Sequence, residues 1–209
     1  MPLGFSRLLN LRSLKLCGTR LLRLPKLPPT LRHLNLIATS INFSELEGSQ
    51  SLEDHTLPEL ETLELSNNHL LTCPALQILL KPSKGKLTEL DLSSCGQIDK
   101  AAIHGLITNG YLDGIVDLRL SNSDVDDFTA EAIAGSCPKL KKLNLSGTKI
   151  TGVGVKSLVQ KPHGMIEELC LNDCTGVSLD AVAYAEAKGI NVSFRFPDSV
   201  KYGKRIRLS

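Results

Sequence analysis

Six cysteines and five histidines are the side chains of this 209-residue chain that could bind a metal or form a catalytic pair. Cys170 and Cys174 are separated by three residues, a spacing that could supply two zinc ligands. No second pair of Cys or His lies close to them in the sequence. The alternative is that the cysteines are reduced, buried structural thiols. We favour this interpretation, and with it we expect no metal and no cofactor.

The remaining residues that could support catalysis form no catalytic pattern. None of the histidines, at positions 33, 55, 69, 104 and 163, has a histidine partner four residues away. The motifs G-x-S-x-G and G-x-x-x-x-G-K-[ST] are absent. Four serines recur at one position of a repeat, which predicts hydrogen bonding in a turn: Ser66, Ser93, Ser121 and Ser146. Four glycines are expected to occupy turns: Gly147, Gly152, Gly154 and Gly164. These observations predict a non-catalytic binding domain.

The elements that position these side chains are set by a recurring phrase, Leu-x-x-Leu-x-Leu, in which Ile twice replaces the first Leu. Seven copies begin at residues 11, 31, 60, 87, 115, 140 and 166, a spacing of 20 to 29 residues. This period and pattern are typical of a leucine-rich repeat. The sequence therefore predicts an α/β fold: a right-handed leucine-rich-repeat solenoid with a parallel sheet on its concave side and helices or extended segments on its convex side.

The segments that return from one strand to the next differ along the chain. Helix formers predict helices over 129–134, 154–159 and 179–188, the last capped by Gly189. Three prolines within residues 24–29 exclude a regular helix there. Residues 42–58 are rich in Glu, Ser and Gly and are expected to form an acidic surface loop.

Residues 1–209 are expected to form a single leucine-rich-repeat domain. Seven repeats run from residue 11 to about residue 186, a partial capping repeat covers 187–196, and a basic tail covers 197–209. In the capping repeat, Ile190 and Val192 are assigned to the fourth and sixth positions of the phrase, and Phe194 and Phe196 are expected to cover the end of the core. The tail could assist nuclear import, contact an acidic partner or be solvated. The pattern starts at Leu11 without a polar cap, so we expect a fragment of a longer chain.

Residues 136–154, S-C-P-K-L-K-K-L-N-L-S-G-T-K-I-T-G-V-G, resemble the cysteine-containing class of leucine-rich repeat, C-P-x-L-x-x-L-x-L-x-x-C-x-x-I-T-D-x-G. Thr148 and Gly152 stand where the class has Cys and Asp. Cys95 and Cys174 occupy the second cysteine position of the class in their own repeats. The resemblance implies that both thiols are buried at the turn that follows the strand.

Such repeats are typical of F-box/leucine-rich-repeat proteins, the substrate receptors of SCF-type (cullin-RING) ubiquitin ligases. This resemblance implies a Skp adaptor and a cullin as partners, bound through an F-box that is not visible in the sequence. The stretch from Ile190 to the basic tail is similar to the fungal F-box/leucine-rich-repeat receptors that also carry tetratricopeptide repeats. That family implies recognition of the replicative helicase in ubiquitin-dependent replisome disassembly.

Composition excludes several other classes of function. The net charge is +2, which gives no reason to expect direct binding of nucleic acid. No apolar run approaches the roughly 20 residues that cross a bilayer, and the first residues lack the pattern of a secretory signal. We expect a protein of the nucleus, the cytoplasm or both, without membrane contact.

The outward-facing strand positions predict where a partner binds. If the leucines at positions 4 and 6 of each phrase point inward, positions 3, 5 and 7 face the concave side. The predicted partner-binding residues are Lys15, His33, Glu64, Glu89, Asp91, Asp117, Arg119, Lys142 and Glu168. Four of them are carboxylates on adjacent strands about 4.8 Å apart, which repel one another unless cations offset them. Arg119 and Lys142 are expected to lie beside these carboxylates and could pair with them.

Two interpretations of this surface stay open. It is either a solvated charged face with local ion pairs or an acidic groove that receives a Lys/Arg-rich segment of a protein partner. The leading function is a protein–protein interaction domain that recognises the substrate of a ubiquitin ligase. The alternatives are a scaffold or inhibitor unrelated to ubiquitin, of the ribonuclease-inhibitor type, and a regulator of GTPase turnover.

Overall fold

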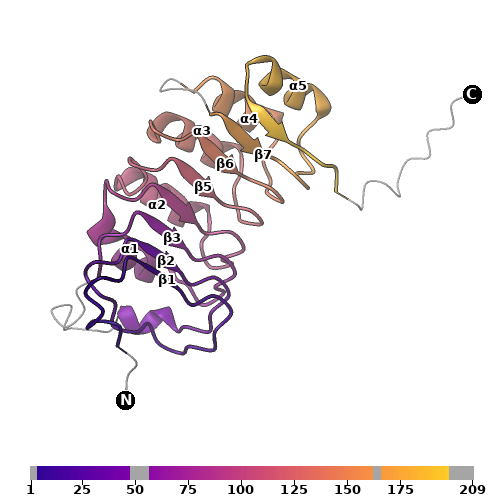
Figure 1. Cartoon of the computed structure of the whole chain (residues 1–209). Helices are drawn as coiled ribbons and strands as arrows, with labels where there is room; N and C mark the ends of the chain where they lie inside the picture. The colour runs from indigo at the N-terminus through magenta and orange to yellow at the C-terminus, as the bar shows by residue number, and fades with distance from the viewer. Residues whose placement is uncertain (1–3, 48–56, 162–165, 198–209) are drawn as a thin grey trace, which may run out of the picture.

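The chain folds into one solenoid with a single parallel sheet, as the computed structural model shows for residues 4–47, 57–161 and 166–197 (Figure 1). Eight strands pair in sequence order, so each repeat adds one strand to the growing edge. The strands are Ser13–Lys15 (β1), His33–Asn35 (β2), Thr62–Glu64 (β3), Glu89–Asp91 (β4), Asp117–Arg119 (β5), Lys142–Asn144 (β6), Glu168–Cys170 (β7) and Asn191–Ser193 (β8). The predicted leucine-rich-repeat solenoid is confirmed.

Helices cover the face of the sheet opposite to the strand positions that were expected to bind a partner (Figure 1). They are the 3-10 helices Phe43–Leu46 (η1) and Lys81–Ser83 (η3) and the α-helices Cys73–Leu80 (α1), Lys100–Thr108 (α2), Asp127–Ser136 (α3), Gly152–Val159 (α4) and Leu179–Ala187 (α5). The three predicted helices are confirmed as α3, α4 and α5, and residues 24–29 contain no helix. The helices α1 and α2 were not predicted from the sequence, although Thr72 and Asp99 cap their first turns.

The core is a stack of the leucines at the fourth and sixth positions. The fourth-position residues pair with one another across every step of the sheet, from Leu14 and Leu34 at one end to Leu169 and Val192 at the other. From the second repeat to the seventh, these leucines are at most 2% exposed. No single three-residue strand could bury its apolar side alone, so the repeats stabilise one another only as a stack.

The turn after each strand needs a residue with positive φ at the eighth position. All seven repeats have one: Gly18, Ala38, Asn67, Ser94, Asn122, Gly147 and Asp173. Gly147 is therefore a turn glycine as predicted. Gly152 and Gly154 are not, because they lie in α4, and Gly164 lies outside the described residues. Gly154 is needed for close packing, since a Cβ there would lie 2.5 Å from Oδ1 of Asp127.

The side chain at the ninth position of several repeats donates hydrogen bonds to buried backbone carbonyl groups near the turn. Asn68 is 1% exposed and donates to the carbonyls of Leu36 (2.8 Å) and Leu65 (2.7 Å). Its side-chain oxygen accepts from the Thr39 backbone N–H at 3.2 Å and from the Thr39 hydroxyl at 2.8 Å. One buried amide therefore makes four hydrogen bonds, three of which join the second and third repeats.

The same position carries a thiol or a hydroxyl in other repeats. The thiols of Cys95 and Cys174 donate to the carbonyls of Leu65 (3.2 Å) and Leu145 (3.1 Å), each in the preceding repeat. Thr148 donates its hydroxyl to the carbonyl of Leu145 at 2.7 Å. Cys95 and Cys174 are 1% and 0% exposed, so their predicted burial is confirmed. Thr148, which departs from the class cysteine, therefore bonds a carbonyl of its own repeat, whereas the two thiols bond a carbonyl of the preceding repeat.

One sequence-based expectation about the return segments is wrong in detail. Residues 42–58 were expected to form a loop, yet they begin with η1, whose Phe43 is fully buried. The aromatic ring makes this segment part of the core, and Asn42 caps it by accepting from the Ser44 N–H at 3.3 Å. Residues 48–56 of that segment, and 198–209 of the expected basic tail, lie outside the described residues.

The capping repeat is also shifted by two residues from the expected phase. Val192 pairs with Leu169, which places Val192 at the fourth position and Phe194 at the sixth. The shift arises because α5 ends in a left-handed turn at Gly189 (φ 86°), after which Ile190 is buried ahead of the strand. Phe194 packs against the core as expected, whereas Phe196 is 40% exposed and contacts the Phe194 ring edge-on.

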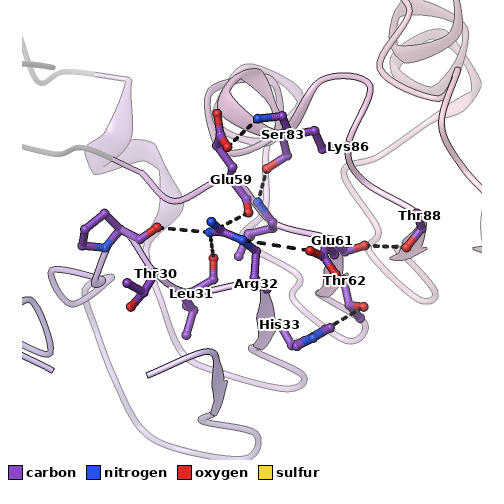
Figure 2. Close-up of polar contacts among 12 residues, drawn as sticks. Thr30, Leu31, Arg32, His33, Glu59, Glu61, Thr62, Ser83, Lys86 and Thr88 are labelled. Carbon is purple, nitrogen blue, oxygen red and sulfur yellow. Dashed lines mark hydrogen bonds and ion pairs between the residues drawn. The ribbon is translucent and has the colours of Figure 1, made fainter. Parts of the chain in front are cut away.

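A polar network on one flank holds the second, third and fourth repeats together (Figure 2). Arg32 donates to the carbonyls of Leu31 (2.9 Å) and Glu59 (3.3 Å), and its Nε lies 4.0 Å from Oε1 of Glu61. Lys86 of the next repeat binds the Glu59 carboxylate at 2.5 Å. The network joins the segments that lead into β2, β3 and β4, and these strands carry several of the predicted partner-binding residues.

The capping residue of α3 gives a pH-dependent prediction. Asp126 accepts from the Thr129 N–H (3.0 Å) and binds Lys100 at 2.9 Å, and the Lys100 hydrogen bond is the main reason that its pKa falls to about 2. Because the pKa of Asp126 is lower in the folded state, its carboxylate stabilises the fold at pH values above the pKa of the unfolded chain, about 3.9. This contribution is lost as the pH falls through about 2. The Asp126→Asn variant keeps a capping side chain but loses the charge. We expect it to unfold more easily than wild type near neutral pH, with the difference shrinking between about pH 4 and pH 2 in thermal melts.

The expected difference is below about 1 kcal/mol, because solvent screens a pair whose side chains are 56% and 29% exposed. A difference in melting temperature that stays constant down to the lowest pH would contradict this assignment.

Candidate functional site

The sheet places acidic side chains directly opposite one another on its open face. Glu64 on β3 pairs in register with Asp91 on β4, and Glu89 on β4 pairs with Asp117 on β5. Side chains paired in this way lie about 5 Å apart, and like charges at that separation destabilise a sheet. Two such pairs on three consecutive strands concentrate negative charge at the middle of the solenoid.

These carboxylates line a shallow depression in the surface. Its lining consists of Leu63, Glu64, Glu89, Leu90, Asp91, Asp117 and Arg119. Four carboxylates and one guanidinium give it a formal charge of −3. The depression thus brings together five of the nine residues predicted to bind a partner. Sequence reasoning assigned Leu63 and Leu90 to the core only, and no sequence signal distinguishes them from the leucines of the other repeats.

Arg119 offsets only part of this charge. Its guanidinium binds Asp117 at 2.7 Å, and this hydrogen bond raises the pKa of Arg119. The charges of Asp91 and Glu64 act in the same direction. Lys142 was expected to help, but it binds Glu168 at 2.8 Å. In-register pairing of β6 with β7 brings the side chains of Lys142 and Glu168 together. Lys142 therefore does not neutralise the charge of the depression.

The four carboxylates differ in how free they are to meet a ligand. Asp91 is 9% exposed and accepts from the Ser93 N–H at 2.9 Å, so it also holds the turn after β4. Glu64 accepts from the Asn35 amide. Glu89 is exposed, and its carboxylate makes no hydrogen bond or ion pair to another described residue. It is therefore the carboxylate most available to a partner.

The other four predicted residues lie on the same face but outside the depression. Lys15 is exposed on β1, at the first edge of the sheet. His33 on β2 is exposed, with its ring nitrogen Nδ1 3.1 Å from the Thr62 hydroxyl. Lys142 and Glu168 pair with each other, as described above. The face therefore divides into an acidic middle and two flanks that bear other charges.

The thiols differ in exposure, which corrects the expectation that all of them are buried. Cys95, Cys137 and Cys174 are buried, Cys73 and Cys170 are half-buried, and Cys17 is exposed. Burial raises the pKa of Cys95 to about 11 and that of Cys137 to about 12. Among the described residues, no group of three or more His, Cys, Asp or Glu is arranged to hold a metal ion. Within the same part of the chain, no helix is long and apolar enough to cross a membrane.

This difference predicts the order in which the cysteines react. When the native protein is treated with a thiol-alkylating reagent, we expect Cys17 to be modified first and Cys95 and Cys137 to stay unmodified until the protein is unfolded. The thiolate is the reactive form, and burial suppresses both its formation and its access to the reagent. Peptide mass spectrometry at successive times would measure the order. Labelling of Cys137 as fast as Cys17 would contradict the packing described here.

Comparison with known proteins supports the repeat assignment. The family model described as Leucine Rich repeat matches residues 86–101 and 136–159. The first match contains β4 and the second contains β6 and α4. No curated protein sequence matches the chain. The architecture and this match together make the chain a leucine-rich-repeat solenoid, a kind of domain that presents an extended concave surface to protein partners.

Proposed function

We propose that this domain is a non-catalytic receptor whose acidic depression binds a Lys/Arg-rich segment of a protein partner. The observation that carries the proposal is the uncompensated formal charge of −3, with Glu89 exposed and unpaired among the described residues. Like charges held in register cost stability, and a cationic segment seated between them would relieve that cost. The half-exposed guanidinium of Arg119 would contribute a cation that a partner carboxylate could meet.

We further propose that the receptor serves an SCF-type ubiquitin ligase and that its concave face binds the ligase substrate. The resemblance of residues 136–154 to cysteine-containing repeats supports this role, as do the thiols of Cys95 and Cys174 at the class position. A Skp adaptor and a cullin would then join through an F-box outside these 209 residues. Replicative helicase subunits are the proposed substrate, which would place the protein in the nucleus for at least part of its life.

Affinity purification of the full-length protein from its own cells tests both levels of the proposal. We expect Skp and cullin subunits in the eluate, together with helicase subunits when ubiquitin transfer is blocked. Recovery of protein partners without Skp or cullin would reject the ligase role and favour a scaffold or inhibitor. Recovery of Skp and cullin without helicase subunits would reject the proposed substrate alone.

A further inference from the structure

Exposed apolar side chains gather at one edge of the helical layer. Beyond residue 70, the described part of the chain exposes four large apolar side chains: Phe128, Val153, Leu179 and Phe196. The first three occupy the fourteenth position of three consecutive repeats, at the start of α3, α4 and α5. Single exposed apolar residues are ordinary on a protein surface, whereas several in one patch mark an interaction site. We call Phe128, Val153 and Leu179 the apolar row.

The apolar row belongs to the interior of the solenoid. The helix α3 packs against α2 on one side and α4 on the other, and α4 packs against α3 and α5 (Figure 1). Phe128 and Val153 are nevertheless 66% and 67% exposed. Because each lies on a helix with a packed neighbour on both sides, its exposure does not depend on what precedes or follows the chain. Leu179 on α5 continues the row and is 60% exposed.

Hydrogen bonds fix the starts of α3 and α4 relative to each other. Asp127 on α3 accepts from the N–H of Thr151 at 2.7 Å and from its hydroxyl at 2.6 Å. The same carboxylate accepts from the Gly154 N–H at 3.0 Å. Phe128 follows this carboxylate in the chain, and Val153 lies between its two partners. The apolar row is therefore held in place before a partner binds, which lowers the entropy lost on binding.

The spacing of the apolar row is close to the repeat of an α-helix. Packed helices lie about 8–10 Å apart, so the row presents one apolar side chain at each such interval. A partner helix returns to the same face every seven residues, a rise of about 10.5 Å. An extended segment covers that distance in about three residues, and an odd number of residues turns its side chains to the opposite face. A helix can therefore meet every member of the row, whereas a regular strand cannot.

The surroundings of the apolar row are acidic. The tenth to fifteenth positions of the fourth to seventh repeats contain five aspartates and two lysines, a net formal charge of −3. Both lysines are already paired, Lys100 with Asp126 at 2.9 Å and Lys149 with Asp124 at 2.6 Å. Asp180 in the first turn of α5 is exposed. Helix dipoles offset part of this charge, so we expect apolar contacts to supply most of the binding energy and the charge to select the partner.

From these observations we propose that the apolar row binds an amphipathic α-helix of a protein partner, whose apolar residues recur every seven positions and whose flanks carry Lys or Arg. The helix would lie across the starts of α3, α4 and α5, with its apolar side chains between those of the row. This surface is separate from the acidic depression on β3, β4 and β5, so the proposal does not rest on the function proposed above.

Other occupants fit the charge less well. In a symmetric dimer of this chain, the two rows would bring their acidic surroundings together, and like charges repel. Nucleic acids and anionic membranes carry the same sign of charge as these surroundings. A basic amphipathic helix is complementary to both the apolar side chains and the carboxylates.

A titration with a fluorescent helical peptide tests the proposal. The peptide has about three heptads, with Leu along one face and Lys on both sides of that face. The 209-residue chain carries Glu89→Lys, so that the acidic depression does not contribute. We expect the added changes Phe128→Ser/Val153→Ser to weaken binding at least about tenfold in anisotropy measurements. The control, Leu22→Ser/Leu70→Ser, removes two other leucines that are more than half exposed and should bind as the parent chain does.

A conservative variant separates binding from folding. Phe128→Leu/Val153→Ile keeps apolar side chains at both positions and should bind as the parent chain does. Circular dichroism checks the fold of every variant. A loss in this variant equal to the loss in Phe128→Ser/Val153→Ser, with the fold intact, would contradict recognition by apolar contact.

Two altered peptides identify the recognised features. A peptide of the same composition with its leucines distributed around the helix should bind at least about tenfold more weakly, and so should a peptide with Glu in place of Lys. Equal binding of either altered peptide, or equal losses in the Ser variant of the row and its control, would overturn the proposal. Absence of binding by the Glu89→Lys chain would overturn it as well. So would dimerisation in sedimentation experiments that Phe128→Ser/Val153→Ser abolishes, because the row would then bind a second copy of the chain.

Discussion

Replacement of Asn68 with alanine is expected to lower the free energy of unfolding by about 2–4 kcal/mol. The variant leaves the carbonyl of Leu36 without its side-chain donor and removes the acceptor that the Thr39 N–H uses. A buried polar group that loses its partner costs about 1–3 kcal/mol. The carbonyl of Leu65 is less affected, because the Cys95 thiol still donates to it. Denaturant unfolding followed by circular dichroism would measure the loss.

Thr148→Val is the matched control, because Thr148 occupies the same position three repeats later. Its hydroxyl donates to the carbonyl of Leu145, which also accepts from the Cys174 thiol. We therefore expect a loss of about 1 kcal/mol or less. In a double-mutant cycle, removing Cys95 together with Asn68 should cost more than the sum of the single changes, since both donate to Leu65. Equal losses for Asn68→Ala and Thr148→Val would contradict the role given to this position.

Reversal of charge at Glu89 is expected to produce the largest change in partner binding. A short fluorescent peptide rich in Lys and Arg should bind the Glu89→Lys variant at least about tenfold more weakly than wild type, a difference of about 1.4 kcal/mol. The variant should also lose part of the salt dependence that wild type shows between about 50 mM and 500 mM salt, because screening weakens the attraction between the charges. Fluorescence anisotropy would report both quantities.

The structure decides which carboxylates are suitable for this test. Asp91 would be a poor choice, because its carboxylate holds the turn after β4 through Ser93 and a change there would confound binding with stability. Glu64→Gln gives a second variant that retains an oxygen to accept from Asn35. Glu131→Lys on α3 makes the same change in net charge at an exposed site away from the depression. Equal affinity of Glu89→Lys and Glu131→Lys would show that the depression does not bind the peptide.

The fold could be predicted from the sequence because one physical requirement repeats in every copy. Each strand is too short to bury its leucines alone, so the spacing of the leucines determines both the stacking and the face to which the other side chains point. The helices α3 and α5 could be predicted because alanine-rich stretches lie between capping residues. The helices over residues 73–80 and 100–108 were not predicted, because their apolar residues fit the buried face of a strand or of a helix. Their caps, Thr72 and Asp99, are single residues in polar turns.

The site was predictable in position but not in electrostatics. Strand alternation placed Glu64, Glu89 and Asp117 correctly on one face, since that depends only on the period of two. The partner of Lys142 was not predictable, because Asp117 and Glu168 flank it in register on both sides and side-chain geometry decides between them. The burial of Asp91 likewise depends on its bond to the turn.

The C-terminal repeat shows a second limit of sequence patterns. Ile190, Val192 and Phe194 alternate with polar residues, so an assignment that starts at Ile190 and one that starts at Val192 satisfy the same spacing. The structure distinguishes them through the end of α5, because the left-handed turn at Gly189 leaves Ile190 to be buried before the strand begins. A period of two does not specify where a strand starts. In this repeat, the turn that ends α5 specifies it.

Carbodiimide cross-linking of the full-length protein with its captured partner tests the central claim most directly. The reagent joins a carboxylate to an amine that contacts it, and mass spectrometry identifies both residues. The account predicts links from partner lysines to Glu89 and Glu64. In the Glu89→Lys variant, we expect either no links at this site or links to Glu64 alone. Partner links confined to carboxylates on the helical face, such as Glu131, would contradict it.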